Sequence, residues 1–498
     1  PMYLKKAAEH YKPIEWDDAF ALIAKNLNSL DSPNHAIFYT SGRASNEAAF
    51  LYQLFVRLFG TNNLPDCSNM CHESSGSALG PTIGIGKGTV TLEDFYESEA
   101  IFVLGQNPGT NHPRMLSALQ TCKRNGGKIV SVNPLKEAGL IGFAHPQEVS
   151  GLLGQATELT DQFVQVRING DQAYLKGLGK VILENPDRID RKFIEEHTEG
   201  FEKYRKATES LEWHDITSLS GILEDEIRKS AEILIKGKSA IFCWAMGLTQ
   251  HKNAVATIQE IVNLQLMLGN LGKTGAGLCP VRGHSNVQGD RTMGIYEKMP
   301  NSFLDRLGEE YEFEPPRGHG FDTVDAIKAM HAQKGKTFIA LGGNFISATP
   351  DTNFTARALQ NCTLTVQIST KLNRSHLITG EEALILPCLG RSEKDESDGK
   401  VQFITMENSM GIVHPSQGSL TPVSDKLRGE PAIIAGMAQA TMGKKANVPW
   451  KKMEEEYGII RDHIEKIIPG FENFNHRVAD GGEFYLPNNA RELDFSEI

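Results

Sequence analysis

One segment of this chain has the order of elements that builds a parallel β-sheet. It begins with the apolar run Ala100–Leu104, which a Gly-rich loop over Gly105–Gly109 follows. The helical spacing of His112–Asn125 comes next, and after two glycines a second apolar run over Lys128–Val132 ends the segment. Two strands joined in this way lie parallel with a right-handed crossover, so the segment predicts an α/β fold.

A later part of the chain repeats this pattern. Leu341-Gly342-Gly343-Asn344 and the following Ala358–Cys362 resemble Leu104-Gly105-Gln106-Asn107 and Ala118–Cys122. Both copies place Gly and Asn after a strand, where open α/β sheets bind nucleotides. Glycine lets the backbone approach a phosphate, and asparagine can donate and accept hydrogen bonds. The repeat predicts two Rossmann-like parallel-sheet domains that hold two similar dinucleotides. The alternative is two α/β units that share only packing rules.

The remaining pattern completes the predicted organisation. Ala254–Leu268 predicts an amphipathic helix, Gly84–Val90 a turn and Arg391–Lys400 a solvated loop. Further strands are predicted over Ala36–Tyr39, Ala240–Trp244, Thr337–Leu341, Leu364–Ile368 and Ala383–Leu386. We expect a discontinuous domain of residues 1–66 and 285–390, a domain of residues 67–284, and further core and connecting helices over residues 391–498.

Composition limits the partners of the chain. Its 498 residues carry a net charge of −11, which gives no electrostatic footprint for nucleic acid. No apolar run approaches the ~20 residues that span a bilayer, so no direct membrane span is expected. The seven cysteines form no C-x-x-C pair, which fits a reducing compartment, and we expect a cytoplasmic location.

Two loops far apart in the sequence carry a thiol, an imidazole and a guanidinium. Cys71-His72 lies in the run CSNMCHESSG, and Arg282 lies in CPVRGHSNVQG. A thiolate can bind a metal, an imidazole can take a proton, and a guanidinium can hold a small carboxylate or oxoanion. Each residue alone indicates little, because a lone cysteine is usually a small buried hydrophobe. Together the three favour a catalytic site.

Motifs over nearly the whole chain give a specific resemblance. In chain order they are Trp16-Asp17-Asp18-Ala19, SGRASNE, GTNN, the Cys71-His72 pair, GQNP, MGLTQ, GNLGKTGAG, VRGHSNVQG and ILP. With these motifs the chain resembles the molybdopterin-dependent oxidoreductases of the dimethyl sulfoxide reductase superfamily. Within that superfamily it is most similar to formate dehydrogenase alpha subunits and their bacterial relatives. The resemblance implies the fold of that family, with its two dinucleotide domains.

The resemblance also implies a cofactor and a reaction. Family members hold molybdenum or tungsten between two molybdopterin guanine dinucleotides, and a cysteine or selenocysteine is a further metal ligand. Cys71 matches that ligand, His72 the proton acceptor, and Arg282 the anchor of the substrate carboxylate in formate oxidation. The implied function is the two-electron oxidation of formate to carbon dioxide, with electrons passed to iron–sulfur partner subunits.

Other positions match contacts of the cofactor in the family. Gly283 and His284 match positions near the metal and the pterins. The resemblance assigns Arg43 to a phosphate, Asn107, Asn133, Gly170 and Asp171 to one dinucleotide, and Asn344, Gln367, Cys388 and Glu430 to the other. Each match is weak by itself, because Asn, Asp and Gly are also common turn residues.

The chain departs from the family pattern at several positions. Asn133 and Asn344 stand where acidic residues are usual, Asn69 replaces an arginine, and Cys71 replaces the selenocysteine of the best-known formate enzymes. The cysteines that bind a [4Fe–4S] cluster would precede this sequence, and a C-terminal β-barrel-like domain would follow it. We therefore expect a fragment whose loops around Cys71 and Arg282 are exposed.

Two other functions stay open on the same fold. A reductase of another oxoanion, or of an N- or S-oxide, would share the pterins but not the Cys-His pair with the arginine. A structural subunit that has lost the metal is the second alternative. The joint presence of Cys71, His72 and Arg282 argues against a purely structural subunit.

Overall fold

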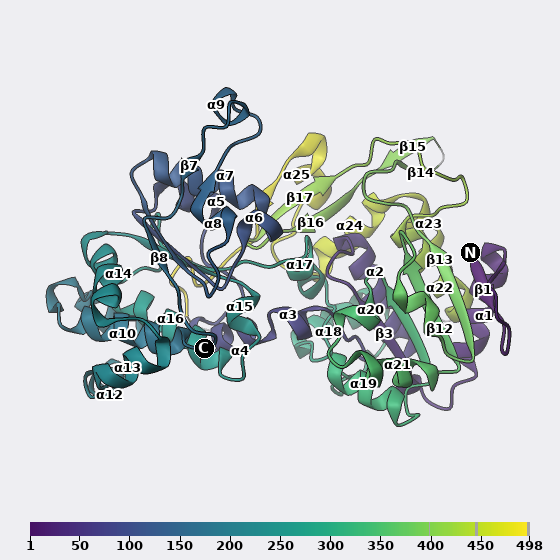
Figure 1. The fold of residues 1–498 in the computed structure, drawn as a ribbon. Coiled ribbons are helices and arrows are strands. Elements are labelled where there is room, and N and C mark those ends of the chain that lie inside the picture. The colour runs from purple at the N-terminus through teal and green to yellow at the C-terminus, as the bar shows by residue number, and fades with distance from the viewer. Residues whose placement is uncertain (398, 444–446, 496–498) are drawn as a thin grey trace. The chain divides into compact units, whose positions relative to one another are not determined.

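Two parallel β-sheets with helices on their faces organise the chain in the computed structural model, which describes residues 1–397, 399–443 and 447–495. The first unit comprises residues 1–70, 284–408 and 412–486. The second comprises residues 71–283, residues 409–411 and the segment from Pro487 onward. Both units have the α/β architecture that the sequence predicts (Figure 1).

The first unit contains a six-stranded sheet in the order β2-β1-β13-β12-β11-β3. Four neighbouring strands are parallel, and β1 and β2 extend the sheet in antiparallel pairing. The strands are β1 (Met2–Leu4), β2 (Lys12–Pro13), β3 (Ala36–Thr40), β11 (Thr337–Leu341), β12 (Leu364–Ser369) and β13 (Glu382–Pro387). These bounds confirm the strands that the sequence predicts over this part of the chain.

Alternate residues of these strands face two different layers of helices. Phe38 packs with helices α1, α2, α22 and α24, whereas Ile37 and Tyr39 pack with α19 and α21. Burial on both faces explains why the four parallel strands are apolar at most positions. The helices of this unit are α1 (Trp16–Asn28), α2 (Asn46–Phe59), α17 (Val287–Thr292), α18 (Asn301–Tyr311), α19 (Thr323–His331), α20 (Phe345–Ala348), α21 (Thr352–Gln360), α22 (Glu430–Met442), α23 (Trp450–Glu455), α24 (Tyr457–Ile467) and α25 (Phe474–Arg477).

Most of the region after residue 390 packs with the first unit. Its strands are β14 (Asp395–Ser397), β15 (Lys400–Gln402), β16 (Ile404–Glu407), β17 (Ile412–Ser416) and β18 (Phe484–Tyr485). A buried ion pair joins Arg461 Nη1 to Glu47 Oε1 at 2.9 Å, and the other oxygen of Glu47 accepts a hydrogen bond from Thr405 N. Helix α2 is thereby tied to both α24 and β16.

The prediction of a solvated loop over Arg391–Lys400 is only partly right. Ser392, Lys394, Glu396 and Lys400 are exposed, but Arg391 and Asp395 are half-buried. The side chain of Arg391 donates hydrogen bonds to the backbone of Arg43 and to Ser285 Oγ. Asp395 begins strand β14 and accepts a hydrogen bond from the buried Tyr457 hydroxyl at 2.5 Å. The charged composition of this run predicts exposure to solvent. The bonding partners of Arg391 and Asp395 come from distant parts of the chain, so no local pattern reveals them. Residue 398 lies outside the described residues.

The second unit contains a five-stranded parallel sheet in the order β10-β9-β4-β5-β8. Phe102 faces the core formed with helices α10, α14 and α16, and Ile101 and Val103 face the core formed with α5 and α7. Its strands are β4 (Ala100–Leu104), β5 (Lys128–Val132), β6 (Gly142–Phe143), β7 (Thr157–Glu158), β8 (Gln162–Val164), β9 (Ala240–Trp244) and β10 (Gly277–Pro280). Strands β6 and β7 form a separate antiparallel pair.

The helices of this unit begin and end where the sequence indicates. Helix α7 starts with Pro113 in its first turn and stops before Gly126, whose φ of 94° favours glycine. The bounds of α16 confirm the helix predicted there. The helices are α4 (Glu73–Ile83), α5 (Leu92–Glu97), α6 (Pro108–Asn111), α7 (Pro113–Arg124), α8 (Ala138–Ile141), α9 (Val149–Leu152), α10 (Asp171–Leu183), α11 (Arg191–His197), α12 (Phe201–Glu209), α13 (Trp213–Ser220), α14 (Glu224–Lys236), α15 (Met246–Thr249) and α16 (Ala254–Met267). Helix α3 (Ser68–Cys71) runs across the boundary between the units.

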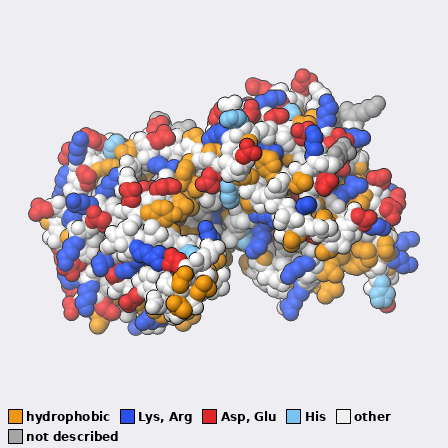
Figure 2. Space-filling model, turned by 90° about the horizontal axis from the view of Figure 1, so that it is seen from above, with side chains coloured by type: hydrophobic (Ala, Val, Ile, Leu, Met, Phe, Trp, Pro, Cys, Tyr) orange, Lys and Arg blue, Asp and Glu red, His pale blue; other side chains and the backbone are white. Residues whose placement is uncertain are grey.

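The surface carries charges of both signs. Basic and acidic side chains are interspersed on the face drawn in Figure 2. This mixture agrees with the absence of a basic footprint in the sequence. Among the helices that the structure describes, none combines the length and the apolar character that crossing a membrane requires.

Candidate functional site

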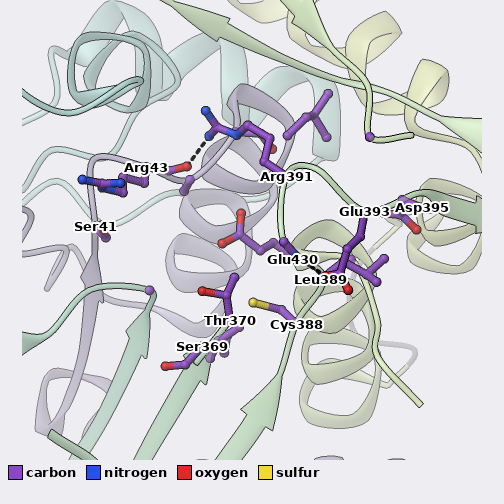
Figure 3. Close-up of a pocket in the computed structure, with 18 of the residues that line it drawn as sticks. Ser41, Arg43, Ser369, Thr370, Cys388, Leu389, Arg391, Glu393, Asp395 and Glu430 are labelled. Atoms are coloured by element: carbon purple, nitrogen blue, oxygen red, sulfur yellow. Dashed lines mark hydrogen bonds between the residues drawn. The ribbon is translucent and has the colours of Figure 1, made fainter. Parts of the chain in front are cut away.

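In the first unit, the predicted residues gather at one edge of the sheet. Strands β3, β11, β12 and β13 are parallel neighbours, so their carboxyl ends meet at that edge. A pocket of about 540 Å³ lies there and is lined by Arg43, Asn344, Cys388 and Glu430, among others (Figure 3). Sequence reasoning named all four residues. Their convergence follows from parallel strand order, which places ligands at the carboxyl ends of strands.

Two glycines shape the floor of this pocket. Gly342 and Gly343 have φ values of 71° and 86°, a conformation that favours glycine. A Cβ on Gly342 would lie 3.3 Å from the Cβ of Ser41, and a Cβ on Gly343 would lie 3.3 Å from the Tyr39 ring. The exposed backbone of this turn can therefore approach a ligand closely. Asn344 follows, and its side-chain oxygen accepts a hydrogen bond from Ser375 Oγ at 3.1 Å.

The carboxyl group of the half-buried Glu430 and a guanidinium face the same pocket. The carboxylate of Glu430, the first residue of α22, projects between Arg391 and Thr370 (Figure 3). Burial raises the pKa of Glu430 to about 7, although the charge of Arg391 and the backbone of Ser45 act in the opposite direction. Arg391 was not foreseen as a site residue. Its position depends on contacts with residues 43 and 285, which no local pattern reveals.

Two predicted residues of this group, Gln367 and Cys388, are buried. Gln367 on β12 is 3% exposed, and both polar atoms of its amide lack a hydrogen-bond partner among the described residues. Buried amides are normally paired, so this amide has capacity for a ligand or an ordered water. Cys388 is buried where β13 ends, and its burial, together with the charge of Glu430, raises the pKa of its thiol.

The pocket of the first unit offers groups that suit the nucleotide part of a pterin dinucleotide cofactor. It offers exposed Gly-rich backbone for a pyrophosphate, and Arg43, Lys371 and Arg391 supply positive charge. Glu430 supplies acceptors that suit the ring N–H groups of a guanine. These groups belong to different strands and loops, so only the folded sheet edge brings them together.

His284 makes a contact that the sequence did not predict. Its Nδ1 lies 3.3 Å from the Sγ atom of the buried Cys67. The same sulfur accepts a hydrogen bond from Gly42 N at 3.1 Å, and a Cβ on Gly42 would lie 2.7 Å from that sulfur. The SGRAS turn is therefore packed directly against this thiol and imidazole. Cys67 and His284 are far apart in the sequence, and no local pattern indicates that they meet.

In the second unit, the predicted residues follow three adjacent parallel strands. Asn107 follows β4, Asn133 follows β5, and Gly170-Asp171 follow β8. The side-chain oxygen of Asn107 accepts a hydrogen bond from Thr110 N, and the side-chain nitrogen of Asn133 donates one to a nearby backbone carbonyl. Both asparagines thus stabilise turns, as their residue type also suggests. The structure places them at the same sheet edge but shows no shared bond.

Asp171 differs from these turn residues because its carboxyl group is buried. It begins helix α10 directly after Gly170, where a Cβ would lie 2.9 Å from the carbonyl oxygen of Leu219. Burial raises the pKa of Asp171 to about 6, while the nearby His251 acts in the opposite direction. A buried acceptor at a helix start suits the N–H donors of a base, as the resemblance implies.

The backbone of Cys71 is held by a neighbouring loop of the second unit. Its carbonyl oxygen accepts hydrogen bonds from Thr249 Oγ1 at 2.6 Å and Gln250 Nε2 at 3.3 Å. These two residues end the MGLTQ motif. The side chain of Cys71 is half-buried, so a soft metal could still reach its sulfur.

His72 is buried, contrary to the expectation of an exposed loop. It is 1% exposed, and its Nδ1 and Nε2 atoms lie 2.9 Å from Ser75 Oγ and 3.2 Å from the carbonyl oxygen of Val281. A carbonyl can only accept, so Nε2 carries the hydrogen and Nδ1 accepts from Ser75. Burial and the charge of Arg282 lower the pKa of His72 to about 3. The ring is therefore neutral, with both nitrogens engaged, and it links the Cys71 segment to the Arg282 segment.

Arg282 is half-buried and ordered by three contacts within the second unit. Its backbone N–H donates to Ser409 Oγ at 2.9 Å, and its carbonyl oxygen accepts from His112 Nε2 at 3.1 Å. Its Nη2 donates to the carbonyl oxygen of Gly86 at 3.0 Å. The structure thus brings His72 and Arg282 together from distant motifs. Gly283 follows, with open space around the position that a Cβ would take.

Comparison with known proteins gives matches over most of the chain. The family model described as Molybdopterin oxidoreductase matches residues 1–399. The chain is 53% identical over 497 residues to the Uncharacterized oxidoreductase Rv2900c of Mycobacterium tuberculosis, covering 99% of this chain and 64% of that protein. It is 29% identical over 340 residues to Formate dehydrogenase H of Escherichia coli, covering 67% of this chain and 44% of that protein. The chain therefore spans 64% of the length of the Mycobacterium tuberculosis protein.

A solved structure extends the likeness to three dimensions. The acetylene hydratase from Pelobacter acetylenicus superposes with a TM-score of 0.73, covering 97% of this chain and 65% of that chain. The two sequences are 17% identical over this match. At that identity the likeness concerns the fold alone.

Proposed function

Because the chain belongs to the molybdopterin oxidoreductase family, we propose that it forms part of an enzyme that oxidises formate to carbon dioxide. The cofactor in this proposal is a bis-molybdopterin guanine dinucleotide with molybdenum or tungsten, which would accept the two electrons. One observation carries the proposal: the His72–Val281 hydrogen bond joins the Cys71-His72 pair to the Arg282 loop. This bond supports the proposal because it connects two segments whose side chains suit a soft metal ligand and an anion anchor.

The proposed roles of the residues are those that the family resemblance implies. We assign Cys71 as the metal ligand and Arg282 as the group that holds the substrate carboxylate through its planar guanidinium. To bind formate in two-point fashion, Arg282 would exchange its contact with the Gly86 carbonyl for one with the substrate. For His72 to accept a proton, the Ser75 hydroxyl would have to turn away from Nδ1. With the bonds as observed, His72 holds the backbone next to Arg282.

The cofactor residues divide between the two units. Arg43, Asn344, Gln367, Cys388 and Glu430 would contact one dinucleotide in the first unit. In the second unit, Asn107, Asn133, Gly170 and Asp171 would contact the other. Gly283 of the second unit and His284 of the first would lie near the metal. We further propose that electrons leave through a [4Fe–4S] cluster to partner subunits. The ligands of that cluster would lie outside this sequence.

The full-length protein provides the direct test. We expect molybdenum or tungsten with two guanine nucleotides per chain, and formate-dependent reduction of an artificial electron acceptor. Metal and nucleotides without formate oxidation would favour the reductase of another oxoanion or oxide. Absence of metal from protein produced in a host that makes the cofactor would favour a structural subunit.

Replacement of the proposed anion anchor gives a specific prediction. Arg282→Lys keeps the charge but loses the planar pair of donors. We expect a loss of about 1.5–3 kcal/mol of transition-state stabilisation, or roughly one to two powers of ten in kcat/KM for formate. Steady-state rates on variants with equal metal content measure it. An unchanged kcat/KM would contradict the assignment of Arg282 to the substrate.

A further inference from the structure

Two successive backbone carbonyls at the Arg282 loop each accept a hydrogen bond from a histidine. His72 Nε2 lies 3.2 Å from the carbonyl oxygen of Val281, and His112 Nε2 lies 3.1 Å from that of Arg282. Both rings must carry hydrogen on Nε2, because a carbonyl oxygen only accepts. Residue 282 follows strand β10, which ends at Pro280, so side chains replace the sheet as partners of this backbone.

His112 is itself fixed by a buried residue. Gln106 Nε2 lies 3.2 Å from His112 Nδ1 and donates to it, because that nitrogen carries no hydrogen when Nε2 does. Gln106 is 3% exposed and follows Gly105 at the end of β4. Gly105 has a φ of 56°, and a Cβ there would lie 2.8 Å from the backbone of Gly247. The support of His112 therefore reaches back to the packed edge of the sheet.

The backbone N–H and the guanidinium of Arg282 also form hydrogen bonds. Ser409 Oγ accepts from its backbone N–H, and the Gly86 carbonyl accepts from its guanidinium. Gly86 can release that guanidinium to a ligand, whereas Ser409 and His112 hold the main chain from which it projects. Because hydrogen bonds hold both the N–H and the carbonyl of residue 282, the position from which its side chain projects is fixed. Pre-positioning of this kind lowers the ordering cost of binding.

We propose that His112 is a positioning residue for Arg282 and that it keeps the guanidinium directed toward a small planar monoanion. This inference rests on the proposed function in one respect, the assignment of Arg282 as the anion anchor. Neither the sequence motifs nor the family resemblance predicted a role for His112. The hydrogen bond from His112 to the carbonyl of Arg282 carries the inference.

Four variants of the full-length, metal-loaded protein test the role of His112. His112→Phe keeps a planar ring but removes both nitrogens, and His112→Gln keeps an N–H donor near the position of Nε2. Arg282→Gln removes the anchor, and the fourth variant combines it with His112→Phe. His214→Phe, on the exposed side of α13, is the matched control. Nitrate serves as the probe because it is a planar monoanion, and its Kd is measured by titration calorimetry.

We expect His112→Phe to raise the Kd for nitrate and the KM for formate roughly tenfold, with kcat within about twofold. His112→Gln should restore most of the loss, and His214→Phe should change nothing. If His112 acts through Arg282, the double variant should bind nitrate no more weakly than Arg282→Gln. Equal metal and nucleotide content in all variants separates this effect from loss of cofactor.

Other results would overturn the inference. Multiplying losses in the double variant would show that His112 acts independently of Arg282. An unchanged Kd in His112→Phe, or a loss of affinity that follows loss of cofactor, would leave His112 with a structural role only. If the wild-type protein does not bind nitrate, or if Arg282→Gln binds it as tightly as the wild type, the premise fails and the inference with it. If the effects of the two substitutions on the Kd for nitrate are non-additive but the enzyme does not oxidise formate, the role of His112 stands and formate is rejected as the substrate.

Discussion

Turnover with formate should collapse when Cys71 is replaced by serine in the full-length protein. The substitution exchanges a soft thiolate for a hard hydroxyl that stays protonated at neutral pH and binds a soft metal–sulfur centre poorly. The backbone around residue 71 should keep its place, because Thr249 and Gln250 bind its carbonyl oxygen rather than its sulfur. We expect a loss of at least about three powers of ten in kcat, with both guanine nucleotides retained.

The measurement combines steady-state rates with nucleotide release and metal analysis on the same preparations. Cys122→Ala is the matched control, because Cys122 is a buried core thiol on α7, away from the carboxyl ends of the strands. It should keep its activity at the cost of some stability. Full turnover in Cys71→Ser would remove Cys71 from the metal site. Loss of both nucleotides would instead show that Cys71 is needed for the fold of the cofactor site.

The strands were the part of the fold that local sequence predicted well. Ala100–Leu104 and Thr337–Leu341 are described with the same bounds that their apolar runs predict. Strands buried on both faces are apolar at most positions, and the glycines after them mark where the strands end. The carboxyl-end edge could therefore be located before the structure, and with it Asn107 and Asn344.

The residues that the sequence missed are held by long-range contacts. Arg391 belongs to a run that composition assigns to solvent, yet it binds the backbone of Arg43. His112 lies in a loop between two helices, where a lone histidine usually has no role, yet it binds the carbonyl of Arg282. Local patterns contain neither partner. The same limit applies to His72, whose burial depends on Ser75 and Val281.

Charge was also difficult to predict from residue type. His72 carries a ring that titrates near neutral pH in water, but burial keeps it neutral in the folded protein. Glu430 and Asp171 are ordinary carboxylates in the sequence, and burial raises the pKa of both. The desolvation that causes these shifts exists only after the sheet edges and their covering loops have assembled.

Glu430→Gln should stabilise the ligand-free protein, and the gain should depend on pH. The pKa of Glu430 rises from 4.5 to about 7 because the folded protein buries the carboxyl group. Between these values the folded state holds a proton that the unfolded state has lost. The stability associated with Glu430 is thus fully present below pH 4.5 and is lost as the pH rises through about 7. The shift corresponds to about 3 kcal/mol.

Chemical denaturation of the cofactor-free protein at pH 5 and pH 8 measures this effect. Glutamine has nearly the same shape but no charge, so the variant should exceed the wild type by up to about 3 kcal/mol at pH 8 and by little at pH 5. Glu381→Gln, at an exposed position paired with Lys6, is the control and should change stability by less than about 1 kcal/mol. Nucleotide binding should weaken in Glu430→Gln, because the amide offers one acceptor where the carboxylate offers two. A variant with unchanged stability at pH 8 would show that Arg391 and the backbone of Ser45 already compensate the buried charge.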